Sequence, residues 1–228
     1  MKSAIVAALA AALMTCAAPA MARLEQLSVQ DAVAGLKAAL EKGSRTAVAS
    51  LGRTDGFLRN PRVKIPLPKS LAKAESLMRR LGARKYADEL IVAMNRAAEQ
   101  AVPEARQLLL DAVRKMSVRD AKGLLTGGNT AATDYFRRTT RTPLHARLLP
   151  IVRRATGRVG LAQTYKRYAG KAAGLGLLDR DESDLDEYVT QRALDALFLM
   201  IADEEKKIRR NPLGAGSKLL GKVFGALQ

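Results

Sequence analysis

The sequence Leu197-Phe198-Leu199-Met200-Ile201-Ala202 is apolar at every position and continues into helical patterns on both sides. A helix without a polar face is typical of an element that is buried all round. Each large side chain in such a helix contributes about 1.5–3 kcal/mol when it is fully buried. We therefore predict that this segment is the central helix of the fold, and that Phe198→Asp prevents folding.

Helical periodicity extends through the sequence that precedes this segment. One apolar stripe follows three- and four-residue spacings along 105–116, and a second follows four-residue steps along 86–98. Pro103 lies between them and predicts a break or sharp kink, because a proline clashes with the preceding helical turn. Strand patterns are nearly absent. The two stripes consist of Ala105, Leu108, Leu109, Ala112, Val113 and Met116, and of Tyr86, Leu90, Met94 and Ala98.

Three serines mark predicted helix starts. Ser28, Ser117 and Ser183 are each followed three residues later by an aspartate, a pattern that resembles the capping box with Asp in place of Glu. Each serine precedes an apolar helical pattern, and the carboxylate also suits the positive end of a helix dipole. We expect helices to begin near residues 28, 117 and 183.

The one predicted extended segment runs from Asn60 to Ser70. Three prolines within it favour a polyproline-like backbone. Val63, Ile65 and Leu67 alternate there, which indicates that one side of this strap lies on the helical body. The alternative is a docking strip for a partner. The predicted fold is all-α: a single multi-helix domain with a central buried helix and an extended proline-containing strap.

Residues 1–22 have the layout of a secretory signal peptide. Lys2 supplies the positive region, residues 4–14 the apolar region, and Ala20-Met21-Ala22 a small-x-small cleavage site. The apolar region is too short to span a bilayer. We therefore predict export to the bacterial periplasm and a mature chain that starts at Arg23.

Cys16 is the only cysteine of the chain. It could anchor a lipoprotein, but Thr15 precedes it where lipoprotein signals normally have a smaller residue, so ordinary cleavage is favoured. After that cleavage no cysteine remains, which excludes disulfides, thiolate ligands and cysteine nucleophiles together. No later segment reaches about 18 consecutive apolar residues, so we expect a soluble or peripheral protein.

The predicted domain organisation has two parts after the leader. Residues 23–212 form the helical domain, and residues 213–228 form a C-terminal amphipathic helix tethered through Gly214 and Gly216. Such a helix either packs back on its own domain or docks on a membrane surface or a partner, and both interpretations stay open. Its apolar stripe consists of Leu219, Leu220, Val223, Phe224 and Leu227.

The formal net charge is +17, from 39 Lys and Arg against 22 Asp and Glu. We expect no nucleic-acid partner, because an exported protein rarely meets nucleic acid. Single-strand binding also needs interleaved aromatic side chains, whereas this chain has four Phe, five Tyr and no Trp. The expected partners are anionic lipids or other anionic envelope components. The alternative is a solvated surface that keeps the protein soluble.

The sequence favours neither a metal site nor nucleophilic catalysis. The acidic run 179–187 has Asp184 and Thr190 where a calcium loop needs Gly and Glu. His145, the only histidine, is expected at the surface, in the first turn of a helix after Pro143, and no nucleophile elbow accompanies it. We predict no metal site and no cofactor.

The segment 126–130, Thr-Gly-Gly-Asn-Thr, has two interpretations. It could form an anion-binding nest ahead of a helix N-terminus. It could equally join two helices, with a glycine ending the first and Asn129 or Thr130 capping the second. We favour the join, because no Lys-Ser or Lys-Thr of a nucleotide-binding loop follows.

The candidate ligand-binding residues fall into two groups. Each combines cations with polar or aromatic side chains on an otherwise apolar helix. If such residues are buried, they need several hydrogen bonds to offset desolvation and could line a cavity. The alternative is a pair of solvated helix faces. The candidates are Asn95, Arg96 and Glu99 in the first group, and Tyr135, Arg137 and Arg138 in the second.

Seven short motifs occur between about Leu27 and Pro212. They are Gly52-x-x-Asp55-Gly56-Phe57-Leu58, Val63-Lys64-Ile65-Pro66-Leu67-Pro68, Met94-Asn95-Arg96-Ala97-Ala98-Glu99, Val102-Pro103-Glu104-Ala105, Leu125-Thr126-Gly127-Gly128, Tyr135-Phe136-Arg137 and Phe198-Leu199-Met200-Ile201-Ala202. Through them the chain resembles the bacterial family catalogued as domain of unknown function 4197. The resemblance implies an exported helical domain, with no established activity or catalytic residues to transfer.

Three functional hypotheses follow. The leading one is an exported binding or scaffold protein of the envelope whose target is an anionic lipid, polymer or protein. The second is an envelope hydrolase that uses helix-borne carboxylates such as Glu99 or Asp134. The third is a membrane-peripheral factor that docks through its C-terminal helix.

Overall fold

The computed structural model describes residues 29–68, 84–157 and 184–211. The predicted signal peptide, the predicted helix 213–228 and residues 179–183 of the acidic run lie outside this part. The described part is helical without a strand and forms one domain, so the predicted all-α fold is confirmed. None of its helices combines the length and apolar character that crossing a membrane requires.

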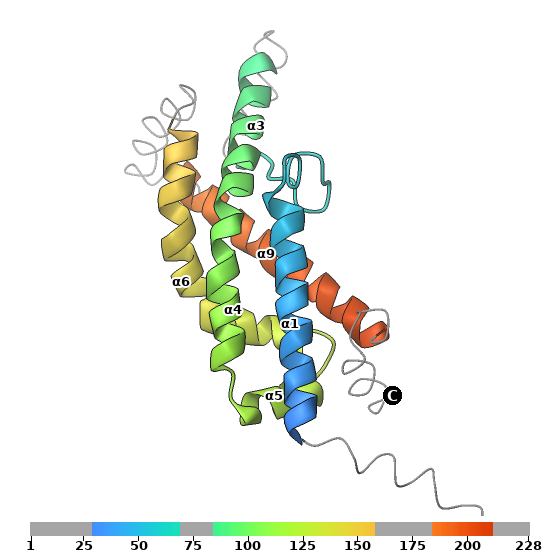
Figure 1. The fold of residues 1–228 in the computed structure, drawn as a ribbon. Helices are drawn as coiled ribbons and strands as arrows, with labels where there is room; N and C mark the ends of the chain where they lie inside the picture. The colour runs from blue at the N-terminus through green and yellow to red at the C-terminus, as the bar shows by residue number, and fades with distance from the viewer. Residues whose placement is uncertain (1–28, 69–83, 158–183, 212–228) are drawn as a thin grey trace, which may run out of the picture.

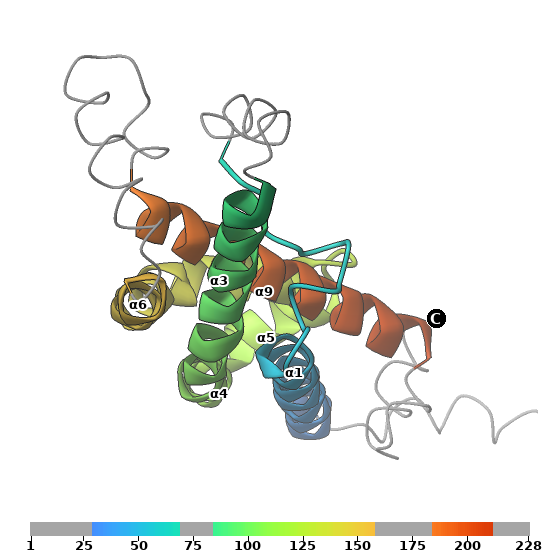
Figure 2. The same ribbon diagram turned by 90° about the horizontal axis from the view of Figure 1, so that it is seen from above.

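The helices pack around α9, which crosses behind α1 and the α3–α4 path in Figure 1. Figure 2 shows the same crossing from above. Helix α9 contacts α1, α3 and α6, so it is the central element. In chain order the elements are α1 (Val29–Gly52), α3 (Arg84–Ala101), the 3₁₀ turn η2 (Val102–Glu104), α4 (Ala105–Lys115), α5 (Val118–Leu125), α6 (Ala131–Thr156) and α9 (Leu185–Arg210).

The centre of α9 is buried on most of its circumference. Phe198 and Leu197 have no exposed surface, as the apolar run predicts. The prediction that the run is buried on every side is wrong at Leu199, whose exposed fraction is 39%. The reason is that the neighbouring helices leave one side of α9 to the strap, and a pocket of about 160 Å³ opens there between Leu199 and residues 62–66.

The chain turns at Pro103 in a single 3₁₀ turn, η2, which separates α3 from α4 as predicted. Figures 1 and 2 together show that the chain changes direction at this turn. A proline is tolerated in a first helical turn because its missing N–H has no partner there in any case. Here Pro103 is the second residue of η2 and so lies in its first turn.

Helix α6 contains Pro143 and Pro150 in its interior and bends along its length (Figure 1). A proline removes one backbone hydrogen bond and clashes with the carbonyl four residues earlier, which bends the helix. The prediction that a helix begins after Pro143 is therefore wrong. His145 therefore lies in the middle of α6. The bend accommodates the Pro143 ring without ending the helix.

Two of the predicted helix starts can be compared with caps. Ser117 forms the predicted capping box with Asp120 at the start of α5. Helix α9 begins near the predicted position, but Asp184 caps it, since its carboxylate accepts hydrogen bonds from the backbone N–H groups of Asp186 and Glu187. Helix α1 is described from Val29 onward, and the predicted start at Ser28 lies outside the described residues.

The strap packs on the helices as predicted. Its residues 63, 65 and 67 are buried, whereas residues 64 and 66 are exposed. The loop between α1 and the strap is also tightly built. A Cβ atom at Gly56 would lie 2.4 Å from the Leu51 carbonyl oxygen, and Asp55 has a φ of 65°. The close backbone approach at Gly56 leaves no room for a Cβ atom, and the left-handed φ at position 55 is one that aspartate tolerates better than most residues.

Candidate functional site

The first candidate group lies on α3, against the strap. Asn95 is fully buried, and its Oδ1 accepts a hydrogen bond from the Ile65 backbone N–H at 2.9 Å. Its Nδ2 donates to the carbonyl oxygens of Ile65 at 2.9 Å and Ile91 at 2.8 Å. The amide therefore pairs with Ile65 as a neighbouring strand would, and it satisfies backbone groups that burial would otherwise leave unpaired.

Glu99 binds the loop that precedes the strap. Its Oε1 accepts hydrogen bonds from the backbone N–H groups of Phe57 at 3.0 Å and Leu58 at 3.1 Å. Its Oε2 lies 2.6 Å from Nη1 of Arg96, whose Nη2 lies 2.7 Å from Oδ1 of Asp55. Hydrogen bonds to Glu99 and then to Asp55 raise the pKa of Arg96, so the guanidinium stays charged. We call Asp55, Asn95, Arg96 and Glu99 the clasp.

The clasp explains the polar residues on α3 by their contacts within the fold. Both oxygens of Glu99 are engaged, and its side chain is only 4% exposed. This carboxylate accepts hydrogen bonds from two backbone N–H groups and the Arg96 guanidinium, so its contacts hold the fold together. The other carboxylate of the hydrolase hypothesis, Asp134, is exposed in the first turn of α6, where Thr130 Oγ1 donates to it at 3.3 Å.

The second candidate group lies at the start of α6, and its members point to different neighbours. The Tyr135 hydroxyl donates to the Ala112 carbonyl oxygen of α4 at 3.2 Å. Burial raises the pKa of Tyr135, so it remains a neutral donor. The Arg137 guanidinium lies 5.3 Å from the centre of the Phe198 ring and covers it. The third member of the group, Arg138, is exposed.

Arg138 is part of a cationic surface where α4 ends, α5 begins and α6 begins. The charges of Arg138 and Arg119 both act on the Asp120 carboxylate. Hydrogen bonds from Ser117 contribute most to the lowered pKa of Asp120, and these two charges lower it further. The Lys37 ammonium donates to the Arg114 carbonyl oxygen at 3.3 Å and adds a cation from α1.

We call this surface the basic corner. Its three carboxylates are already engaged: Asp120 with the Ser117 cap, Asp111 with Gln107 at 2.8 Å and Arg114 at 3.5 Å, and Asp134 with Thr130 at 3.3 Å. Five cations against three anions leave the corner with a formal charge of +2. The cations are Lys37, Arg114, Lys115, Arg119 and Arg138. Among the described residues, no hydrogen bond or ion pair joins the basic corner to the clasp.

The acidic residues at the start of α9 take structural roles. The Asp184 carboxylate caps the helix, and buried Asp186 accepts a hydrogen bond from Thr156 Oγ1. Nε2 of His145 lies 2.7 and 2.8 Å from the two Glu187 oxygens, which ties α6 to α9. No cluster of three His, Cys, Asp or Glu side chains suited to a metal ion occurs in residues 29–68, 84–157 and 184–211.

The sequence matches the family model described as a protein of unknown function, DUF4197, over residues 26–225. The chain belongs to this family. No curated protein and no solved structure matches the chain. The motifs through which the chain resembles the DUF4197 family include both sides of the clasp, because Asp55 and Ile65 lie in two of them and Asn95, Arg96 and Glu99 in a third.

Sequence reasoning missed Arg119 and Glu205. Arg119 is part of no sequence motif, and it is recognised only because its charge and that of Arg138 act on the same Asp120 carboxylate. Glu205 is buried and caps α6: its oxygens accept hydrogen bonds from the backbone N–H groups of Ala132 at 3.0 Å and Thr133 at 2.9 Å. The segment 126–130 joins two helices as favoured, but Thr130 makes no side-chain cap, since Glu205 supplies it.

Proposed function

We propose that this DUF4197 protein is an exported binding or scaffold protein of the bacterial envelope, and that its target carries negative charge. The observation that carries the proposal is the basic corner, where five exposed or half-exposed cations face three aspartates, each engaged by a neighbour. Arg119 and Arg138 form no ion pair among the described residues, so binding an anion there breaks no bond of the fold.

Export supports the choice of partner. The signal-peptide layout of residues 1–22 favours the periplasm, where anionic lipids, lipopolysaccharide phosphates and acidic polymers are available. N-terminal sequencing of the protein from the envelope is expected to begin at Arg23. A Lys or Arg beside an anionic membrane contributes about 1 kcal/mol, and the effect decays within a Debye length of about 8–10 Å. Binding through the corner should therefore weaken as salt rises.

Co-sedimentation with vesicles tests the proposal. We expect binding to vesicles that contain phosphatidylglycerol, little binding to pure phosphatidylcholine, and release by salt. The double variant Arg119→Glu/Arg138→Glu should lose most of this binding. Its matched control is Arg106→Glu/Arg154→Glu, which changes the net charge equally at the opposite ends of α4 and α6, on exposed arginines that form no ion pair in the described part.

Two results would contradict the proposal. Equal loss in both double variants would mean that net charge alone, rather than the basic corner, causes binding. If the protein binds neither anionic vesicles nor lipopolysaccharide nor acidic polysaccharide, the proposal that its target is anionic is wrong. Removal of residues 217–228 in the same assay measures what the C-terminal segment, with Leu219, Leu220, Val223, Phe224 and Leu227, adds as a membrane contact.

A further inference from the structure

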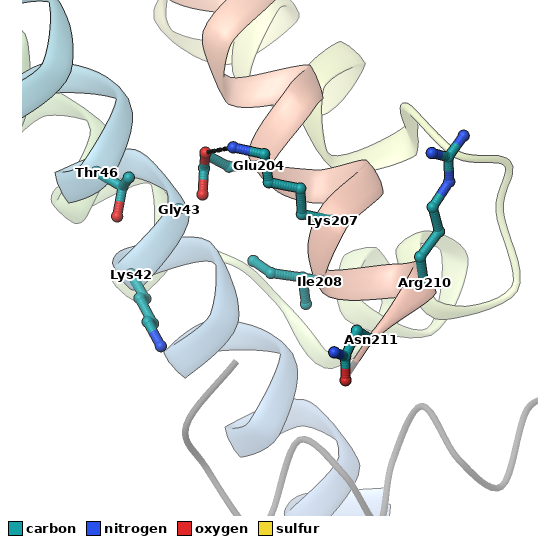
Figure 3. Close-up of a pocket in the computed structure, with 8 residues that line it drawn as sticks. All are labelled: Lys42, Gly43, Thr46, Glu204, Lys207, Ile208, Arg210 and Asn211. Atoms are coloured by element: carbon teal, nitrogen blue, oxygen red, sulfur yellow. Dashed lines mark hydrogen bonds and ion pairs between the residues drawn. The ribbon is translucent and has the colours of Figure 1, made fainter. Parts of the chain in front are cut away.

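Two hollows on the surface differ in the state of their cations. The first, of about 580 Å³, lies between α1 and the last turns of α9 (Figure 3). Its Lys207 lies 2.7 Å from Glu204 Oε1, and its Arg210 guanidinium points away, so these two cations do not hold a ligand there. The second, of about 160 Å³, opens where the strap passes over α9, a crossing that Figure 2 shows from above. We call it the strap pocket, and its walls include Arg62, Lys64 and Pro66 from the strap and Arg192, Asp195 and Leu199 from α9.

The walls of the strap pocket are held in place by contacts on both sides. The Tyr188 hydroxyl of α9 donates to the Pro66 carbonyl oxygen at 3.1 Å, and Arg62 Nη1 lies 2.6 Å from Asp203 Oδ2. The clasp fixes the opposite side of the strap through the backbone of Ile65. The pocket is therefore formed before any ligand arrives, and a pre-formed site loses less conformational entropy on binding.

The strap pocket offers apolar surface to the solvent. Leu199 is 39% exposed although it belongs to the apolar run of the central helix, and Pro66 on the strap is exposed as well. Ala196 also lines the pocket, three residues before Leu199 on the same face of α9. A volume of about 160 Å³ is below the range of about 300–1,000 Å³ that is usual for small-molecule sites. The pocket therefore suits one apolar side chain of a larger partner, whereas the acyl chain of a lipid is too long for it.

Two cations beside this apolar surface are unpaired within the described part of the chain. Lys64 on the strap and Arg192 on α9 are exposed, and neither side chain forms an ion pair or a hydrogen bond with another described residue. The Arg192 guanidinium lies 5.1 Å from the centre of the Tyr188 ring, a contact that leaves its N–H donors available. The other charged residues of the lining, Arg62 and Asp195, each have a partner of opposite charge. One unbalanced positive charge is left on each wall.

We propose that the strap pocket binds an acidic segment of another protein, with one apolar side chain in the pocket and a carboxylate on each side of it. The apolar side chain contacts Leu199 and Pro66, as the buried anchor of a protein interface does. One carboxylate meets Lys64 and the other meets Arg192, whose planar guanidinium can bind a carboxylate through two hydrogen bonds.

This proposal gives the strap both of the roles that its sequence predicted. Its inner residues pack on the helical body, and its outer residues form one wall of a docking site. The strap pocket shares no residue with the basic corner, so the inference is independent of the proposed function.

Fluorescence anisotropy with the purified full chain and labelled nine-residue peptides tests the proposal. Two of the peptides have a central leucine or a central serine between two pairs of aspartates, with glycines at both ends. A third has the central leucine between two pairs of lysines. We expect the acidic leucine peptide to bind at least tenfold more tightly than the serine peptide, and the lysine peptide not to bind. Binding should weaken as salt rises, because exposed charges are screened.

Variants of the two walls separate the charged contacts from the apolar one. Lys64→Glu/Arg192→Glu should weaken binding of the acidic leucine peptide at least tenfold. The matched control is Lys122→Glu/Arg154→Glu, the same change of charge on an exposed lysine and an exposed arginine whose side chains pair with no described residue. Leu199→Ser should weaken binding of the leucine peptide at least threefold and leave binding of the serine peptide unchanged, which a general loss of folding would not do.

Several results would overturn the proposal. These are no binding of the acidic leucine peptide, equal affinity for the serine peptide, equal losses in the two double variants, or unchanged binding in Leu199→Ser. If no peptide binds and Lys64→Glu/Arg192→Glu instead lowers binding to phosphatidylglycerol vesicles, the surface contacts lipid and the proposal is wrong. Failure of the basic corner as an anion site would not affect these measurements, because Arg119 and Arg138 are unchanged in every variant used here.

Discussion

Two buried carboxylates, Glu99 and Glu205, perform the same task in different parts of the molecule. Glu99 accepts hydrogen bonds from the N–H groups of two successive loop residues, and Glu205 does so for two successive residues at the start of α6. Each also pairs with an arginine of its own helix, Arg96 in the first case and Arg209 in the second. Each carboxylate thereby fixes a segment that is remote in sequence.

The two sites differ in the solvation of the cation. The Arg96 side chain is 33% exposed and divides its hydrogen bonds between Glu99 and Asp55. The Arg209 side chain is 12% exposed, and its Nη2 donates to Glu205 Oε1 at 2.9 Å and to the Leu124 carbonyl oxygen at 2.8 Å. Removing a carboxylate leaves a cation that water can solvate in one site and a largely buried cation in the other. We therefore expect the loss of stability on removing a carboxylate to depend on how deeply its arginine partner is buried.

The largest effect is expected for Glu205→Ala. The change removes the cap of α6 and the carboxylate partner of a buried arginine, which should lower the free energy of unfolding by about 3–5 kcal/mol. Denaturant unfolding followed by circular dichroism measures the loss. Glu205→Gln keeps one acceptor oxygen and serves as the milder variant. A loss below that of the corresponding Glu99 variant would contradict the comparison.

Glu99→Ala should cost less, about 2–3 kcal/mol, because Arg96 remains hydrated and keeps Asp55 as a partner. The buried N–H groups of Phe57 and Leu58 lose their acceptor, so the loop should open before the rest of the domain unfolds. Limited proteolysis then cleaves faster between residues 53 and 64 than in the Glu205 variant. Cleavage at the same rate as in wild type would show that the clasp does not hold this loop.

Asn95→Ala separates the strap from the charged part of the clasp. It removes the two hydrogen bonds to Ile65 but leaves Glu99 and Arg96 paired, and about 1–2 kcal/mol should be lost because backbone groups are left without partners. Hydrogen exchange of the Ile65 amide should accelerate, while that of Phe57 should stay as in wild type. Acceleration at both amides would mean that the strap and the loop open together as one unit.

Glu187 provides the smallest effect, since it is partly exposed and lies outside both carboxylate sites. Its burial raises the pKa, but hydrogen bonds from Gln191 and His145 outweigh burial and lower it below the usual value. The stabilisation is therefore complete above the unfolded pKa of about 4.3 and is lost as the pH falls through the folded value. The stability gap between wild type and Glu187→Gln should narrow as the pH falls below about 4. If the difference in the free energy of unfolding between the two proteins stays constant with pH, the ionised Glu187 carboxylate does not contribute to stability.

The candidate residues on α3 were recognisable from sequence because Asn95, Arg96 and Glu99 interrupt an apolar helix. Their role was not, because their partners lie about 30–40 residues away. Glu205 follows Glu204 and precedes two lysines, a pattern that is typical of a solvated helix face. A signal existed nevertheless: Glu205 falls on the same helical face as the buried residues Phe198, Ile201 and Ile208.

Local sequence patterns were enough to predict the elements of this protein: helices with apolar stripes, a turn at Pro103, a capping box at Ser117, and a strap whose alternate residues are buried. These features depend on side-chain size, backbone geometry and spacings within one helical turn or a few strand residues, which are local properties. Which polar groups meet became known only from the packed fold. The contacts of Glu205 with the start of α6 and of Glu99 with Phe57 depend on how the helices cross, and so does the approach of Arg119 and Arg138 to Asp120. A crossing follows from the packing of all side chains at once.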